Sequence, residues 1–461
     1  MLTNPVARLK RLITSRFSRD IFQLAFPLAL QSAVHSGLGI IDRIMVGSLQ
    51  ETAISGVGIG GQTLFFTANL CGAIAAGASI LAAQLRGRGD IDGLKKLTGA
   101  AFALSGIMGL VFAVTVFVFA QSLSMWLSGQ NAAISVEAAG FIRITIVTAP
   151  FVLWTFVITG IMRALGDTKT PLISGALTIG CNTALNALLI FGMFGFPKLG
   201  VTGAALATAT SEILGFAVSL YFFRNLRWKE LSFRFSYVKT FSSSMAIRIL
   251  KVSMPILLDA LFWQAASLTY TKVVGLNGQN ALAAYFIFQG FRSMGYIPLG
   301  AIGISVATLT GVFLGADHRK RADTLVSFAM RLSIFFSGFM GLGYIAFASL
   351  YLTFFNVQPS VAATSILLIR LFAFVIPFEG IIVMLANVLR SGGDGLAVSV
   401  ITLSTFWLVG IPSAWFFSTF IGWGMPGFFL GTALESISKS LFFYFRRARA
   451  NWARNLVART S

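Results

Sequence analysis

The sequence predicts an all-α integral membrane protein with twelve transmembrane helices in two related six-helix halves. Of its 461 residues, 56% are hydrophobic and 11% are charged, a composition far from that of a soluble globular domain. Apolar runs of about 20 residues, the length that spans a bilayer, recur along the chain between short polar loops. The first run, PLALQSAVHSGLGIIDRIMVG, returns in the second half as PILLDALFWQAASLTYTKVVG. The chain therefore repeats one six-helix pattern.

Hydropathy over a window of about 19 residues places the spans in order. We expect them at 20–47, 54–85, 97–120, 136–161, 171–193 and 200–223, and then at 250–275, 281–315, 322–348, 361–389, 396–420 and 425–445. This map gives a basic N-terminal tail (1–19), an N-terminal lobe (20–223), a basic linker (224–249), a C-terminal lobe (250–445) and a basic C-terminal tail (446–461). Because each lobe has an even number of spans, the repeat is parallel, about an axis along the membrane normal.

The net charge is +20, and the positions of the basic residues indicate how the chain is oriented in its membrane. Most of the 35 Lys and Arg lie in the tails, the linker and alternate loops, while the opposite loops hold only Lys198. By the positive-inside rule, both termini and the linker are cytoplasmic. Proteins that bind nucleic acid carry their basic residues on hydrated faces, so we expect no nucleic-acid partner.

Acidic residues inside the apolar spans are the first candidates for function, because a charge there is costly unless it has a partner or faces a cavity. Gln31, His35 and Asp42 share one face of the first span, which we interpret as lining an aqueous pocket. Asp259 and Glu379 lie in the second half, and neither is mirrored in the first. We interpret the three unmirrored acids as ion-coupling or substrate sites.

The alternative for these acids is structural, a buried carboxylate paired with a base such as Arg370. Glu212 and Glu435 occupy near-matching places in spans 6 and 12, which favours a packing role for them. The further candidates for a substrate cavity are two amides one turn apart and two aromatic residues, which alternatively bind neighbouring helices or fill the core: Asn182, Asn186, Trp263 and Tyr270.

Motifs of soluble enzymes are missing from the sequence: it has no P-loop and no metal-spaced cluster of His or Cys. We therefore expect a transporter driven by an ion gradient, with no cofactor beyond a coupling ion, H+ or Na+, and with no enzymatic activity. Two alternatives stay open. One is a flippase for lipid-linked or amphipathic molecules, which would favour a wider and more basic cavity; the other is a membrane enzyme that uses Asp167 and Asp394.

Several motifs together resemble the multidrug and toxic compound extrusion (MATE) family. They are the paired segments given above, RALGDTKTPL after span 4, NALLIFG at the end of span 5 and GVTGAALATA at the start of span 6. The resemblance covers nearly the whole chain, from Leu24 to Phe445. It implies two six-helix lobes that form a V around a central cavity, in a monomer of the bacterial inner membrane surrounded by lipid. It also implies antiport of H+ or Na+ against cationic or amphipathic drugs, and hence multidrug efflux and antibiotic resistance.

The resemblance also assigns roles in the N-terminal lobe. Asp42 matches the acid of the family's first helix, and Asn182 matches a polar residue that accompanies it. Asn186 departs from DinF-like members, which carry Asp there, so this lobe has one carboxylate fewer and a Na+ site in it is in question.

In the C-terminal lobe, Glu379 stands eleven residues before Arg390, as does the span 10 acid of NorM-like members. Asp259 lies about one turn from their span 7 acid. The two carboxylates are therefore expected to hold Na+ or a cationic drug, and the chain combines features of both branches.

The topology is tested by single cysteines in a background that lacks Cys71 and Cys181. We expect Ser243→Cys in the linker region to react only with reagent on the cytoplasmic side, and Ser128→Cys to react only from outside, because the basic loops define the cytoplasmic face. Labelling of both positions by an impermeant maleimide added outside would contradict the map.

Overall fold

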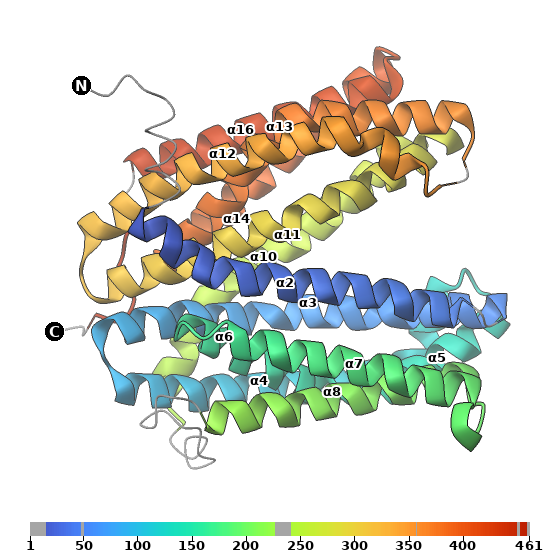
Figure 1. Cartoon of the computed structure of the whole chain (residues 1–461), viewed down its shortest axis with the longest axis horizontal. Coiled ribbons are helices and arrows are strands. Elements are labelled where there is room, and N and C mark those ends of the chain that lie inside the picture. The colour runs from blue at the N-terminus through green and yellow to red at the C-terminus, as the bar shows by residue number, and fades with distance from the viewer. Residues whose placement is uncertain (1–14, 48–49, 226–240, 356, 450–451, 459–461) are drawn as a thin grey trace. The chain divides into compact units, whose positions relative to one another are not determined.

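The structure is a computed structural model that describes residues 15–47, 50–225, 241–355, 357–449 and 452–458. Inside these ranges the side chains at positions 35, 38–44 and 71 are not described. The chain divides by its internal contacts into two compact units. The C-terminal unit comprises Met1–Ala29 and Leu258–Ser461, and the N-terminal unit comprises Leu30–Leu257. Figure 1 shows each of them as a bundle of long helices that run side by side.

Helix α2 (Arg16–Val46) begins in the C-terminal unit and continues in the N-terminal unit, and α10 (Ser243–Gly275) begins in the N-terminal unit and ends in the C-terminal one. The other helices of the N-terminal unit are α3 (Glu51–Arg88), α4 (Ile91–Leu127), α5 (Ala132–Ile146), α6 (Ala149–Ala164), α7 (Lys169–Phe191) and α8 (Gly200–Arg224). The C-terminal unit continues with α11 (Gln279–Gly315), α12 (Arg319–Leu352), α13 (Pro359–Ser391), α14 (Gly395–Ser404), α15 (Ile411–Trp415) and α16 (Gly424–Arg449).

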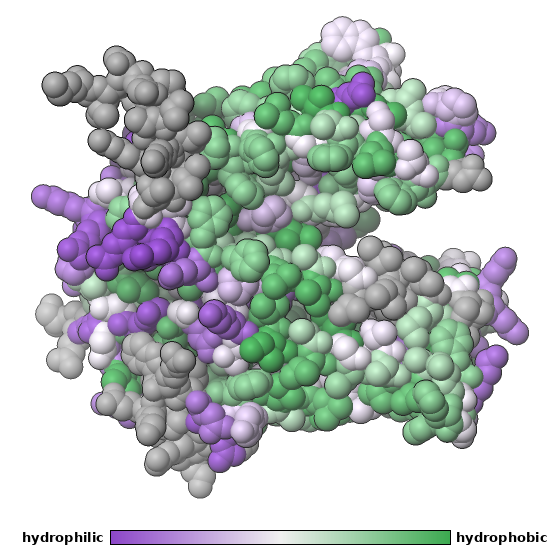
Figure 2. Space-filling model, viewed as in Figure 1, coloured by the Kyte–Doolittle hydropathy of each residue, from purple (hydrophilic) through white to green (hydrophobic). Residues whose placement is uncertain are grey.

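Every predicted span coincides with a helix or a nearly continuous helical stretch, so the all-α fold with two repeated halves is confirmed. In the described part of the chain, eight helices are long and apolar enough to cross a membrane, or nine if α5 and α6 form one broken span. Many large apolar side chains remain exposed, among them Leu110, Leu342 and Leu408. Figure 2 shows such hydrophobic residues over much of the visible helix surface. A lipid environment removes the cost of this exposure.

One predicted span, 136–161, is bent rather than straight. Helices α5 and α6 meet at an angle of 51°. Pro150 lies in the first turn of α6, where its missing N–H costs no hydrogen bond. Gly109 of α4 packs against it, since a Cβ at that glycine would lie 2.6 Å from the proline Cα. The bend therefore depends on a proline and on a neighbour that has no side chain.

Span 11 contains two π-helical stretches, Thr405–Gly410 and Phe416–Phe420, on either side of α15. Such stretches are rare in helices and occur frequently at functional sites. The first of them ends at Gly410, where an added Cβ would lie 2.0 Å from the Tyr270 hydroxyl and 2.7 Å from Cγ of Glu435. Glycine is thus required for α10 and α16 to approach this span so closely.

The first half of α2 packs in the core of the C-terminal unit. Ile21, Ala25 and Leu28 follow one another at helical spacing and are 0%, 4% and 6% exposed. They share a hydrophobic cluster with Leu325 of α12 and Trp452 of the C-terminal tail. The core of this unit therefore includes residues from both ends of the chain.

The C-terminal tail docks on the loop between α13 and α14. The backbone N–H of Arg454 donates to the Gly392 carbonyl at 3.1 Å. A Cβ at Gly392 would lie 2.4 Å from the carbonyl oxygen of Trp452. Asp394 of the same loop accepts two hydrogen bonds from Arg446, at 2.7 and 2.9 Å. Backbone and indole contacts thus hold residues 452–458 on this loop, and the ion pair of Asp394 with Arg446 joins the same loop to α16.

We expect Trp452→Ala to release the tail, because a buried Trp cut back to Ala loses about 3 kcal/mol of packing. The measurement is limited proteolysis of the purified protein after residue 449, together with its thermal midpoint. Trp423 is 55% exposed and provides the matched control, Trp423→Ala, which should change neither result. Equal protease resistance of the Trp452→Ala variant and the unchanged protein would contradict the docking.

Candidate functional site

The candidate site is a cavity of about 260 Å³ inside the C-terminal unit. Helices α10, α11, α13, α14 and α16 and the first π-helical stretch contribute its lining. Aromatic rings form much of the wall, and three acids and three bases also line it: Asp259, Glu379, Glu435, Arg292, Arg390 and Lys439. A cavity that combines aromatic surface with a few convergent charged groups is typical of a small-molecule site.

Helical spacing brings these side chains to one place. Asp259, Trp263 and Tyr270 lie on one face of α10, because residues four and eleven positions apart are separated by nearly whole turns. By the same spacing, Glu379 and Arg390 share one face of α13. On α10 and on α13, the residues that line the cavity therefore form a stripe along one face of the helix.

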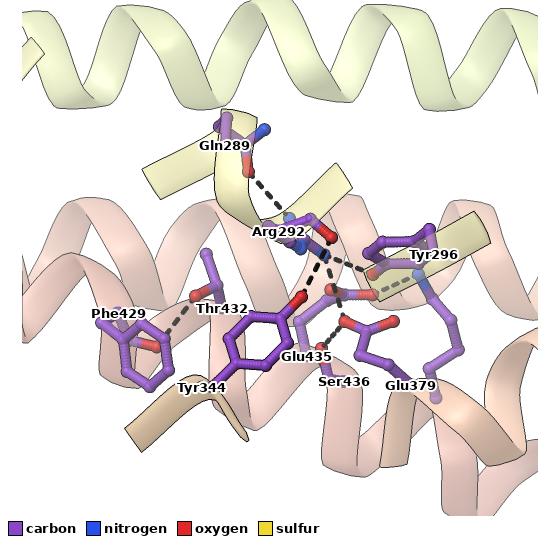
Figure 3. Close-up of polar contacts among 10 residues, drawn as sticks. Gln289, Arg292, Tyr296, Tyr344, Glu379, Phe429, Thr432, Glu435 and Ser436 are labelled. Carbon is purple, nitrogen blue, oxygen red and sulfur yellow. Dashed lines mark hydrogen bonds and ion pairs between the residues drawn. The ribbon is translucent and has the colours of Figure 1, made fainter. Parts of the chain in front are cut away.

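Glu379 is the centre of the largest hydrogen-bond network in the cavity (Figure 3). Its Oε1 atom lies 3.1 Å from Nη2 of Arg292 and accepts a hydrogen bond from the Ser436 hydroxyl at 2.8 Å. Arg292 also donates to the Tyr296 hydroxyl at 2.8 Å and to Oε1 of Gln289 at 3.2 Å. The Glu379 side chain is only 7% exposed, so this network compensates its charge in a low-dielectric site.

Asp259 forms the second ion pair. Its Oδ2 atom lies 2.5 Å from Nη2 of Arg390, and both side chains are 18% exposed. The two residues come from α10 and α13, which this pair joins across the cavity.

The third pair, between Glu435 and Lys439, lies within α16 at a spacing of four residues. Their side chains are 7% and 8% exposed. Nζ of Lys439 also lies 3.6 Å from the centroid of the Phe406 ring, a cation–π contact. Each acid of the cavity therefore has its own base, and the six charges formally cancel.

Several residues expected from the sequence thus meet in this cavity. Asp259, Glu379, Trp263 and Tyr270 all line it. Glu435, which the sequence favoured as a packing residue, lines it as well. Arg370 does not pair with Glu379: it donates to the Ser349 hydroxyl at 3.3 Å in an exposed position.

The two amides expected to line a cavity in the N-terminal lobe contact each other, and their role in a cavity stays a prediction. Nδ2 of Asn186 donates to Oδ1 of Asn182 at 3.2 Å, and Asn186 is fully buried. Gln31 packs against Gly175: a Cβ added at Gly175 would lie 3.3 Å from Nε2 of Gln31. His35 and Asp42 belong to α2, but their side chains lie outside the described part of the structure.

The loop acids named for an enzyme have structural partners. Asp167 caps α7, since it accepts hydrogen bonds from the Thr170 backbone N–H at 3.0 Å and from its hydroxyl at 2.6 Å. Asp394 is paired with Arg446, as described above. Among the described side chains, no three of His, Cys, Asp or Glu gather as a metal site. A Na+ site at Asp259 and Glu379 stays a prediction.

Arg292, Lys439 and Ser436 belong to the site but were not predicted from the sequence. Two of them carried a signal. Arg292 is a base in the middle of an apolar span, and such a base requires an acidic partner as much as an acid requires a basic one. Lys439 follows Glu435 by four residues, the spacing of a helical ion pair. Ser436 carried none, because serine is common in transmembrane helices.

Comparison with known proteins agrees with the repeat and with the fold. The MatE family model matches the chain twice, over residues 27–188 and 255–416. A probable multidrug resistance protein NorM of Thermotoga maritima is 23% identical over 441 residues, which cover 95% of this chain and 94% of that protein. The probable multidrug resistance protein YoeA of Bacillus subtilis is 25% identical over 447 residues, covering 96% and 95%.

Solved structures share the architecture. One is the outward-facing conformation of a multidrug resistance MATE family transporter of the MOP superfamily, with a TM-score of 0.86 and 19% sequence identity. The match covers 95% of this chain and 97% of that one. The two family matches in sequence, together with this fold, lead to one conclusion: the chain belongs to the MATE family of multidrug efflux transporters, which are multi-pass membrane proteins.

Proposed function

We propose that this protein is a cation-coupled antiporter that exports organic, cationic or amphipathic compounds by alternating access, with H+ or Na+ as the coupling ion. The observation that carries the proposal is the buried set of three carboxylates in one aromatic-lined cavity, each neutralised by a base of the same chain. A carboxylate of this kind has three alternative partners: its own base, a coupling ion and a cationic solute. Exchange among them links ion movement to solute movement.

Charge in the cavity makes such an exchange feasible. Breaking one buried pair without a replacement leaves an uncompensated charge and costs several kcal/mol. A proton or Na+ on Glu379 replaces the compensation that Arg292 provides, and a solute cation does the same. Their occupancies therefore compete, as antiport requires.

The proposal gives the two lobes different roles. Asp42 is the indispensable coupling acid, because it shares a helix face with Gln31 and His35 and matches the family's first-helix acid. Asp259 and Glu379 have a second role in the C-terminal lobe, where they bind the solute cation or Na+. The aromatic lining near them, with Trp263 and Tyr270, supports binding of flat or cationic groups.

The balance of charges gives no support to the flippase alternative, which favours a wider and more basic cavity. The three bases of the C-terminal cavity are matched by three acids.

We also propose that the protein lies in the bacterial inner membrane, as a monomer with cytoplasmic termini. The bias of basic residues toward one set of loops supports the cytoplasmic termini.

The test uses proteoliposomes loaded with tetraphenylphosphonium, with a pH gradient and a Na+ gradient imposed separately and without ATP. We expect one gradient to drive transport, Asp42→Asn to reduce that transport at least about tenfold while leaving binding intact, and Glu379→Gln to weaken binding by about tenfold, the effect of roughly 1.4 kcal/mol.

A matched control is Asp92→Asn, which removes an acid whose side chain is 84% exposed and which should transport normally. If Asp42→Asn transports normally and Glu379→Gln alone uncouples ion from solute, the coupling acid belongs to the C-terminal lobe. Transport that needs neither gradient would contradict antiport itself.

A further inference from the structure

The surroundings of Lys439 have the chemistry of an ammonium-binding site. A cation binds well where an aromatic face and a carboxylate converge in a site with little water. Phe406 offers its ring face and Glu435 its carboxylate, and both are buried, at 8% and 5% exposure. The Lys439 amine lies over the Phe406 ring and forms an ion pair with the Glu435 carboxylate. The chain's own amine therefore occupies the place that an organic cation would take.

More aromatic rings extend this site beyond the lysine. Tyr270 contacts Phe406 and Phe428 edge to face, with ring centroids 6.1 and 5.7 Å apart. Tyr285 contacts Phe428 in the same way at 5.5 Å. All of these residues line the cavity. A ligand with an apolar body next to its cationic group would find ring surface on several sides.

The Tyr270 hydroxyl is among the buried polar atoms of the cavity that have no hydrogen-bond partner in the described structure. It lies against Gly410, the glycine whose missing side chain also gives room to Glu435. A buried hydroxyl without a partner is costly, and a ligand that accepts or donates a hydrogen bond there would relieve this cost.

The Lys439 amine has fewer described partners than the Arg292 guanidinium. Arg292 is fixed by Glu379, Tyr296 and Gln289 at once. The contacts of the Lys439 amine that the structure describes are with Glu435 and Phe406 only. Its flexible four-carbon stem allows it to swing away without any movement of the backbone.

We propose that Glu435, Phe406 and Tyr270 form a subsite for the ammonium group of an organic cation, and that Lys439 is a tethered competitor for this subsite. The inference rests on the proposed function and deepens it, because it names the group of the solute that binds here. A solute cation then binds only if its contacts with the subsite are more favourable than those of the Lys439 amine. Apolar surface next to the cationic group provides these additional contacts. Lys439 also keeps the cavity neutral when no solute is bound.

The experiment is equilibrium binding of benzyltrimethylammonium to the purified full-length protein, measured by calorimetry with no ion gradient. Lys439→Met removes the competitor while keeping the length of the side chain. We expect it to bind the probe about tenfold more tightly or better, since a desolvated cation–π contact becomes available to the ligand. Adding Phe406→Leu or Glu435→Gln to Lys439→Met should abolish the gain.

Two controls separate this effect from a general change of charge. Lys272→Met removes a lysine from an exposed position of α10 and should leave binding unchanged. Benzyl alcohol, which has the ring without the cation, should bind the Lys439→Met variant and the unchanged protein alike. Lys439→Arg, which retains the charge and can hold Glu435 at two points, should bind the probe more weakly than the unchanged protein.

Unchanged or weaker binding by a folded Lys439→Met variant would overturn the proposal and leave Lys439 as a structural partner of Glu435. If that variant fails to fold, unchanged or tighter binding by Lys439→Arg would overturn it instead. The assay contains no gradient, so its outcome is independent of ion coupling. Failure of gradient-driven transport would therefore leave the subsite intact, and failure of the subsite would leave antiport untouched.

Discussion

A charge buried in a membrane protein must be compensated, and the C-terminal cavity depends on this constraint. Its three carboxylates are each satisfied by a base from the same unit, and Glu379 is bound in addition by Ser436. Because desolvation makes an isolated charge so costly, none of these acids can lose its partner without gaining another. The competition between an ion and a solute that we propose rests on this same constraint.

Small residues and breaks in the helices make the arrangement possible. Gly410 ends a π-helical stretch and lets the Tyr270 hydroxyl and Glu435 approach the backbone, while that stretch also carries Phe406 beneath Lys439. Irregular backbone of this kind occurs in membrane proteins where it lines a cavity or is covered by protein. The irregular span and the charged cavity are therefore parts of one feature.

The sequence predicted the fold well because the length and spacing of apolar runs are local properties. All twelve spans, including 136–161 and 396–420, correspond to helical segments, although the sequence did not reveal the break in the first or the π-helical stretches in the second. The acids Asp259 and Glu379 were found because an ionisable residue in an apolar run is conspicuous. The bases that pair with these acids were not predicted. Arg292 and Glu379, for example, are 87 residues apart, and only tertiary packing brings them together.

The most direct test of competition at the buried acids is the affinity of the protein for tetraphenylphosphonium at equilibrium, measured while H+ and Na+ activities are varied independently. If the solute and the coupling ion exclude each other, the affinity should fall by about tenfold for each tenfold rise of one of these ions above its own dissociation constant. An affinity that is independent of both ions would contradict the account.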